Sequence, residues 1–132
     1  MVMLAPDVRG SPDASPVLAF LNSYFAAIDN HDYQQYLRLL DQQMQRSATP
    51  GKFFAGSGST TDSAATLTQI SPSDGGDVAA TVIFTSHQQP SESPDRTACT
   101  SWTITVYLEP QGAAYVMMPP PPGYEASHQP CQ

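Results

Sequence analysis

The chain has 132 residues, the length of one domain, and 40% of them are hydrophobic, which is enough to build a core. Its formal net charge is −7 and it has only five lysines and arginines, so side chains that could contact phosphate groups are scarce. This composition argues against binding to nucleic acid or to anionic lipid, and it leaves cationic, neutral and protein partners open. The sequence contains no run of about 18 apolar residues, so we expect no membrane span in this segment.

The first residues, 1–14, mix proline, aspartate and glycine without hydrophobic periodicity, and they predict a flexible leader or linker. The apolar stretch at Met1–Ala5 is too short for the core of a signal peptide and has no basic residues before it. The protein is therefore either cytosolic or an exported chain whose targeting segment lies upstream.

Two helices are predicted after this leader. Ser15 followed by Pro16 is a typical helix start, and apolar residues then recur at helical spacing as far as Asp29. Asp32 and Gln35 match a capping box, in which the acid caps a helix and a Gln or Glu follows three residues later. Because only two or three residues separate the two helices, we expect them to form a sharply angled pair.

The rest of the chain predicts β-structure. The clearest signal is the stretch 97–108, in which apolar residues and Thr100 alternate with threonines, Cys99, Ser101 and Tyr107. The expected strands are 64–71, 77–88, 97–108 and 113–118. A helix face and a sheet face must cover each other, so the predicted class is α+β, with the domain at 15–118. Four consecutive prolines then end the sheet, and residues 119–132 form a proline-rich tail.

The two cysteines bear on the cellular compartment. A disulfide between Cys99 and Cys131 would tie the tail to the sheet and, in the chain-entropy model, contribute about 3–4 kcal/mol. We favour this disulfide, and with it an oxidising, extracytoplasmic compartment; the alternative is one buried thiol and one thiol at a frayed terminus. A zinc site that adds His87 and His128 matches no known ligand spacing, so we expect no metal and no cofactor.

Several stretches resemble the nuclear-transport-factor-2-like (cystatin-like) superfamily, and in particular its exported actinobacterial members. These stretches are Phe20–Asp29, His31–Tyr33, Phe84–Gln88, Pro94–Asp95 and Cys99–Trp102, within a resemblance that covers about residues 16–118. The resemblance implies a helix pair in the concave face of a strongly curved antiparallel sheet of about four strands. The third helix of that fold would fall in 47–63, which is rich in glycine and serine. We expect a surface loop there, anchored by Phe53–Phe54 and able to include a helical turn or a short strand, and hence an open or shallow cone.

The superfamily that the chain resembles includes steroid isomerases, polyketide cyclases and dehydratases as well as non-catalytic binding domains. The residues of the site must therefore decide the function. Within the predicted strands, residues 78–86 and 97–108 contain no Asp, Glu or His that could serve as the base these enzymes carry on the sheet, and His87 lies at a strand end next to a polar loop. The candidate pocket residues that remain are Tyr24, Asp29, Asp32, Tyr36 and Trp102. Ordinary roles compete with this interpretation, namely helix capping for Asp32 and core packing for the two tyrosines.

We therefore expect a non-catalytic extracytoplasmic domain that binds a protein, a small hydrophobic ligand or a second copy of itself. The outward residues Thr97, Thr103, Thr105 and Tyr107 would form a flat, uncharged face for a homodimer, although a solvated face explains them equally well. The alternative function is a cyclase- or isomerase-like enzyme that acts on a small hydrophobic substrate, and the lack of a base on the sheet weighs against it.

Overall fold

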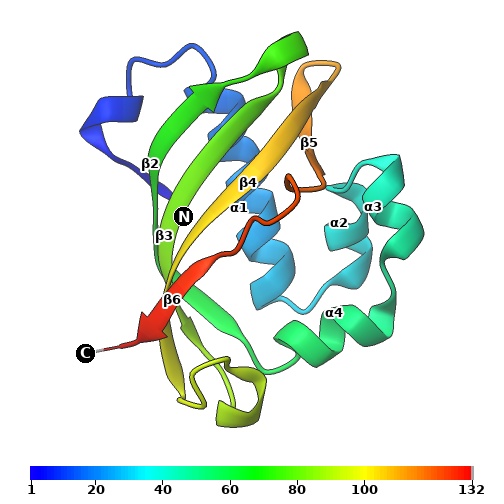
Figure 1. Cartoon of the computed structure of the whole chain (residues 1–132), viewed down its shortest axis with the longest axis vertical. Helices are drawn as coiled ribbons and strands as arrows, with labels where there is room; N and C mark the ends of the chain where they lie inside the picture. The colour runs from blue at the N-terminus through cyan, green and yellow to red at the C-terminus, as the bar shows by residue number, and fades with distance from the viewer. Residues whose placement is uncertain (132) are drawn as a thin grey trace.

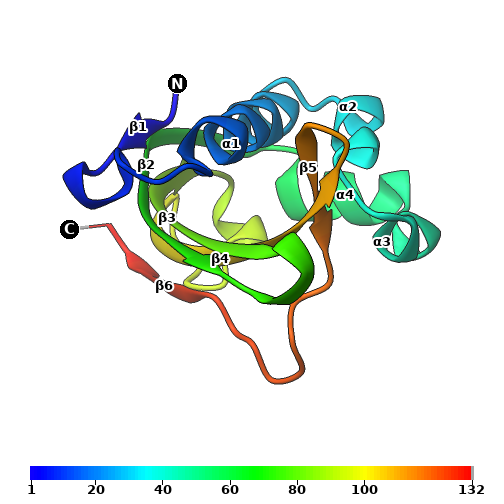
Figure 2. The same cartoon turned by 90° about the horizontal axis from the view of Figure 1, so that it is seen from above.

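The computed structural model describes residues 1–131, and this part of the chain forms four α-helices and one six-stranded sheet (Figure 1). The expected α+β class is confirmed. The helices are α1 (Ala14–Asp29), α2 (Tyr33–Arg38), α3 (Gln42–Ser47) and α4 (Pro50–Ser57). The strands are β1 (Met3–Leu4), β2 (Thr61–Pro72), β3 (Val78–His87), β4 (Cys99–Gln111), β5 (Ala114–Met118) and β6 (Ser127–Pro130). Figure 2 shows the sheet curving around α1, with α2, α3 and α4 grouped at one side.

The sheet has the order β1-β2-β3-β4-β5, and β6 also pairs with β4. Strands β3 and β4 pair without a break from Val78 opposite Leu108 to His87 opposite Cys99. All four expected strands are present as β2 to β5, but the count of about four is wrong, because both ends of the chain add a strand. Strand β1 pairs in parallel with β2, which makes the sheet mixed, and β6 pairs antiparallel with β4 beyond the end of β5.

The first residues lie on the domain, in the segment where we expected a flexible leader. Val2 and Val8 are only 4% and 3% exposed, and both belong to the hydrophobic core cluster. The Val2 N–H donates to Asn22 Oδ1 of α1 (2.8 Å), and the Ala5 N–H donates to the Leu67 carbonyl of β2 (3.0 Å). A strand of two residues is too short to show a period, so the sequence pattern carried no signal for it.

Helix α1 supplies most of the helical contribution to the core. Its predicted apolar stripe is buried against the sheet, since Val17 and Leu21 are fully inaccessible and Phe20, Phe25 and Ile28 are nearly so. The helix begins at Ala14, with Asp13 at the N-cap position and no side-chain cap, one residue before the expected Ser15. No helix in residues 1–131 is long and apolar enough to cross a membrane.

The second helix was expected to run from Asp32 past Met44, but it is interrupted, and the expected surface loop at 47–63 contains helix α4. The chain instead forms three short helices, α2, α3 and α4, and each is capped by its own side chain: Asp32 accepts from Gln35 N–H, Asp41 from Met44 N–H and Thr49 from Lys52 N–H. Pro50 opens α4, and Phe53 is buried as its apolar anchor. Helix capping therefore outweighs the low helix propensity of the glycines in α4.

The tail returns along the free part of the β4 edge. The N–H of Thr105, which lies between the residues paired with β5 and those paired with β6, donates to the Tyr124 hydroxyl (2.6 Å). The Tyr124 ring also packs edge-on against Tyr107 at a centroid distance of 5.6 Å. Of the outward residues expected to form a dimer face, Thr105 and Tyr107 therefore contact Tyr124 of the tail. Thr103 pairs with Ser127 of β6 but keeps an exposed side chain, and Thr97 lies before β4 begins.

Candidate functional site

A cavity of about 220 Å³ lies between the helices and the concave face of the sheet. Its apolar walls come from Ile28 of α1, Phe84 of β3, and Trp102 and Ile104 of β4. Its polar groups come from α1, α4, the first residues of β2, the end of β3 and the loop that follows β3. The polar and small residues at its wall are Tyr24, Gly56, Ser57, Thr60, Asp62, Ser86, Gln88 and Glu92.

The central polar group of the cavity is Asp62, the second residue of β2. It pairs across the sheet with Ser86, but the Ser86 hydroxyl donates to Gln88 Oε1 (2.6 Å), and Asp62 Oδ1 is buried without a hydrogen-bond partner in the described part of the chain. Burial, and secondly repulsion by the Asp29 carboxylate, raise the pKa of Asp62 to about 7. Asp62 therefore exchanges a proton near neutral pH.

Asp29 stands behind Asp62, at the C-terminal end of α1. Its Oδ1 accepts a hydrogen bond from the Asp62 backbone N–H at 2.7 Å, and it contributes to a neighbouring surface pocket that Asp62 also borders. Asp29 therefore fixes the start of β2 against α1 and places a negative charge beside the Asp62 carboxyl group. Asp29 can have both roles because it is the last residue of α1 and lies next to the residues where β2 begins to pair with β3.

Three aromatic residues, Tyr24, Phe84 and Trp102, line the same cavity as Asp62. Burial, with smaller contributions from Tyr36 and Asp62, raises the pKa of Tyr24 well above its ordinary value, so its hydroxyl stays protonated. Phe84 and Trp102 are cross-strand partners whose rings lie stacked, 6.4 Å apart and 13° from parallel. The Tyr24 ring meets Phe25 edge-on at 5.3 Å, and Phe25 in turn meets Phe84 at 5.0 Å. The site therefore combines one titrating carboxyl group with flat apolar walls.

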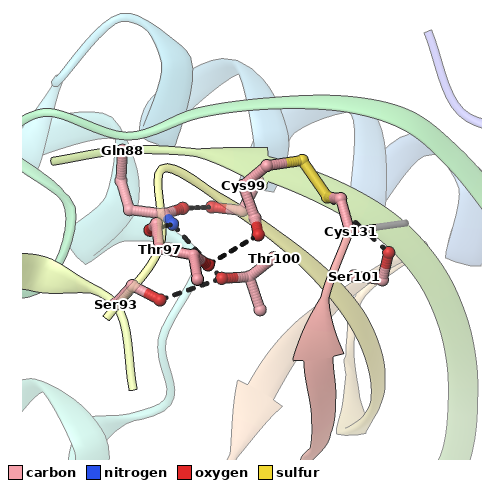
Figure 3. Close-up of a disulfide and its surroundings, with 8 residues drawn as sticks. Gln88, Ser93, Thr97, Cys99, Thr100, Ser101 and Cys131 are labelled. Atoms are coloured by element: carbon pink, nitrogen blue, oxygen red, sulfur yellow. Dashed lines mark hydrogen bonds between the residues drawn. A yellow bond between two sulfur atoms is a disulfide. The ribbon is translucent and has the colours of Figure 1, made fainter. Parts of the chain in front are cut away.

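The loop between β3 and β4 forms the outer wall, and a buried polar network holds it (Figure 3). Gln88 Nε2 donates to the Thr97 carbonyl (2.9 Å) and to Thr100 Oγ1 (3.2 Å), and the Ser93 and Thr100 hydroxyls lie 3.0 Å apart. Glu92, which lines the cavity, accepts the Ser59 N–H at 3.2 Å and so joins the loop to the residues after α4. The wall is therefore fixed on both sides.

Next to this network, Cys99 of β4 and Cys131 form a disulfide, which confirms the expected pairing (Figure 3). The disulfide holds β6 along β4, so that His128 lies opposite Trp102, with ring centroids 5.1 Å apart. His128 Nδ1 lies 3.0 Å from Asp95 Oδ1 of the β3–β4 loop. The tail therefore supports both the Trp102 ring and the loop that form the cavity wall.

The structure separates the five candidate pocket residues. Tyr24 and Trp102 line the cavity, and Asp29 lies behind it as the acceptor for the Asp62 N–H. Asp32 is exposed and caps α2, so its ordinary structural role prevails. Tyr36 packs against Phe53, 4.9 Å between centroids, and lines a different surface pocket between α2 and α4.

The sequence interpretation missed Asp62 and Glu92. Strand β2 was expected to begin at Ala64, so Asp62 fell in a loop. The lack of a base on the sheet holds for 78–86 and 97–108 but not for β2, whose second residue is Asp62. The register shift between Ser63 and Thr66 explains the error, because an irregularity breaks the alternation that marks a strand. Glu92 had no local signal, since its place in the cavity depends on how the β3–β4 loop folds back.

Among residues 1–131, no group of three or more His, Cys, Asp or Glu side chains is placed to hold a metal ion. Comparison with known proteins adds no relative to this description: no protein-family model, no curated protein and no solved structure matches the chain.

Proposed function

We propose that this chain is an extracytoplasmic ligand-binding domain of the nuclear-transport-factor-2-like type, which takes a small molecule with an apolar body and one polar group into the cavity above the sheet. The arrangement of a helix against the concave face of a curved sheet supports the fold assignment (Figure 2). The disulfide supports an extracytoplasmic location, because such bonds persist in oxidising environments.

The observation that carries this proposal is the composition of the cavity wall. A preformed cavity with mostly apolar walls and a few convergent polar groups is the usual form of a small-molecule site. Here the Phe84–Trp102 pair forms the apolar wall, and Asp62 carries a buried oxygen that lacks a hydrogen-bond donor. A buried acceptor without a donor is costly, by about 1–3 kcal/mol, and a ligand that supplies the donor recovers this cost.

The proposal is tested by filling the cavity from helix α4. Gly56 lines the cavity, and a Cβ atom placed on it meets no atom within 4 Å. We expect Gly56→Leu to abolish binding of one-ring probes such as benzyl alcohol, benzylamine, benzoate and cyclohexanone, without loss of stability, because Leu favours helix over Gly by about 0.8 kcal/mol. Binding is measured by the fluorescence of Trp102, the only tryptophan, and by calorimetry.

The matched control is Gly51→Leu, which places the same side chain in the same helix but outside the cavity wall. It should leave probe binding unchanged. The proposal is wrong if none of the probes binds the unmodified protein, or if Gly51→Leu and Gly56→Leu affect binding equally.

A second candidate function, a cyclase- or isomerase-like enzyme, is favoured by one observation. Asp62 exchanges its proton near neutral pH and shares the cavity with the protonated hydroxyl of Tyr24, a pairing suited to a base and a hydrogen-bond donor. The base of such an enzyme would be Asp62 and neither of the carboxylates, Asp29 and Asp32, that the sequence suggested for the pocket. If this function is correct, Asp62→Asn should abolish turnover of an enolisable ketone and retain its binding; turnover that survives the substitution would exclude it.

The homodimer through the outer sheet face stays a prediction. Ile83 and its cross-strand partner Thr103 have exposed side chains on that face, although the Thr103 backbone also pairs with β6. Sedimentation at increasing concentration would test it.

A further inference from the structure

Resting on the proposed function of this cavity, we infer that its ligand is a small organic cation, a primary amine on a one-ring or similarly compact apolar body. Three features of the cavity wall favour such a ligand: its charge, its aromatic faces and its unpaired carboxylate oxygen. None of these features depends on the family resemblance.

The charge at the wall is of one sign. Asp62 and Glu92 both line the cavity, and none of the residues at its wall is lysine, arginine or histidine. Tyr24 and Asp29 of α1 are the other titratable groups next to Asp62, and neither supplies a positive charge. An anionic ligand would therefore enter a site that already holds unbalanced negative charge, whereas a cation would balance it.

The aromatic faces favour the same ligand. Trp102, Phe84 and Tyr24 contribute rings to one small cavity, and Trp is the aromatic residue that attracts cations most strongly. Glu92 is partly committed, because its Oε1 accepts the Ser59 N–H, so Asp62 is the carboxylate left for the ligand. A protonated amine between these rings and Asp62 would have both a carboxylate partner and a ring face.

The unpaired oxygen distinguishes an amine from a neutral alcohol. Asp62 Oδ1 is buried and has no donor among the described residues, and Ser86 donates to Gln88 instead. An ammonium group carries three N–H donors, and its hydrogen bonds to a carboxylate are about twice as strong as neutral ones. The cavity of about 220 Å³ lies below the range of drug-sized sites, roughly 300–1,000 Å³, which limits the body to about one ring.

The test compares three probes with one body and different charge: benzylamine, benzyl alcohol and benzoate. Each is titrated calorimetrically into the unmodified protein and into Asp62→Asn at pH 8, where the carboxyl group is mostly ionised. We expect benzylamine to bind at least about ten-fold more tightly than benzyl alcohol, with benzoate weakest. In Asp62→Asn the preference for benzylamine over benzyl alcohol should disappear.

The control variant is Glu125→Gln, which removes one negative charge from the exposed tail and should leave the preference unchanged. Equal or tighter binding of benzyl alcohol to the unmodified protein would overturn the cation inference and leave the proposed ligand-binding function intact. Binding of none of the three probes would overturn the cation inference, and if cyclohexanone also failed to bind, the proposed ligand-binding function would be overturned as well. A preference that persists in Asp62→Asn would show that Asp62 is not the group that recognises the amine.

Discussion

Replacing Asp62 with Asn is expected to raise the free energy of unfolding by about 2–4 kcal/mol at pH 8 and to change it little at pH 3. The reason is that the fold raises the pKa of Asp62 from its ordinary 3.8 to about 7 through burial and repulsion by Asp29. Ionising the group in the folded protein is therefore costly, whereas the unfolded chain ionises it freely.

The raised pKa of Asp62 determines the pH range over which this residue affects stability. Below pH 3.8 both states hold the proton, so the contribution of Asp62 to stability is fully present; it is lost progressively as the pH rises through about 7. The measurement is urea unfolding of the variant and the unmodified protein at several pH values, plotted as the difference between them. That difference should grow from pH 4 to 7 and then level off.

Asp32→Asn is the matched control, because Asp32 is exposed and Asn caps a helix as well as Asp does. We expect it to change stability by less than about 0.5 kcal/mol. A difference curve for Asp62→Asn that is flat with pH would mean that the carboxyl group is well solvated or paired, and it would also weaken the proposed ligand site.

Removal of the disulfide is also expected to change the free energy of unfolding strongly. Replacing both Cys99 and Cys131 with Ser should lower the free energy of unfolding by about 3–4 kcal/mol, because the bond closes a loop of 32 residues and restricts the unfolded chain. Strand β6 has four exposed residues, and the disulfide is its covalent link to β4. We therefore expect β6 to separate from β4 first.

Two measurements test this prediction. Urea unfolding with and without a thiol reductant should show the loss in the unmodified protein and none in the double Ser variant, which has no disulfide to reduce. Hydrogen exchange should quicken at the β4–β6 pairs, including Trp102 opposite His128, before it quickens at the β3–β4 pairs. Equal midpoints with and without reductant would contradict the prediction.

The expected elements that the structure confirms are those with long, regular patterns. The stripe of α1 and the alternation in 97–108 each repeat many times, so local irregularities do not obscure them. The short helices α3 and α4 were missed because six to eight residues show little periodicity, although the Asp41 and Thr49 caps were present in the sequence. The capping residue Thr49 therefore indicated a helix in a segment whose glycine- and serine-rich composition predicted a loop.

The sequence by itself determined the α+β class and the pairing partner for Cys99, and it identified Tyr24 and Trp102 as pocket residues, because each of these depends on residue type, regular spacing or the number of cysteines. Only the tertiary structure decided the site. Burial in the folded protein raises the pKa of Asp62 most, and repulsion by Asp29, which lies 33 residues earlier in the chain, adds to the increase. Contacts between residues far apart in the chain produce no periodic pattern in the sequence. The sequence near Asp62 therefore did not indicate that this acid lines the cavity.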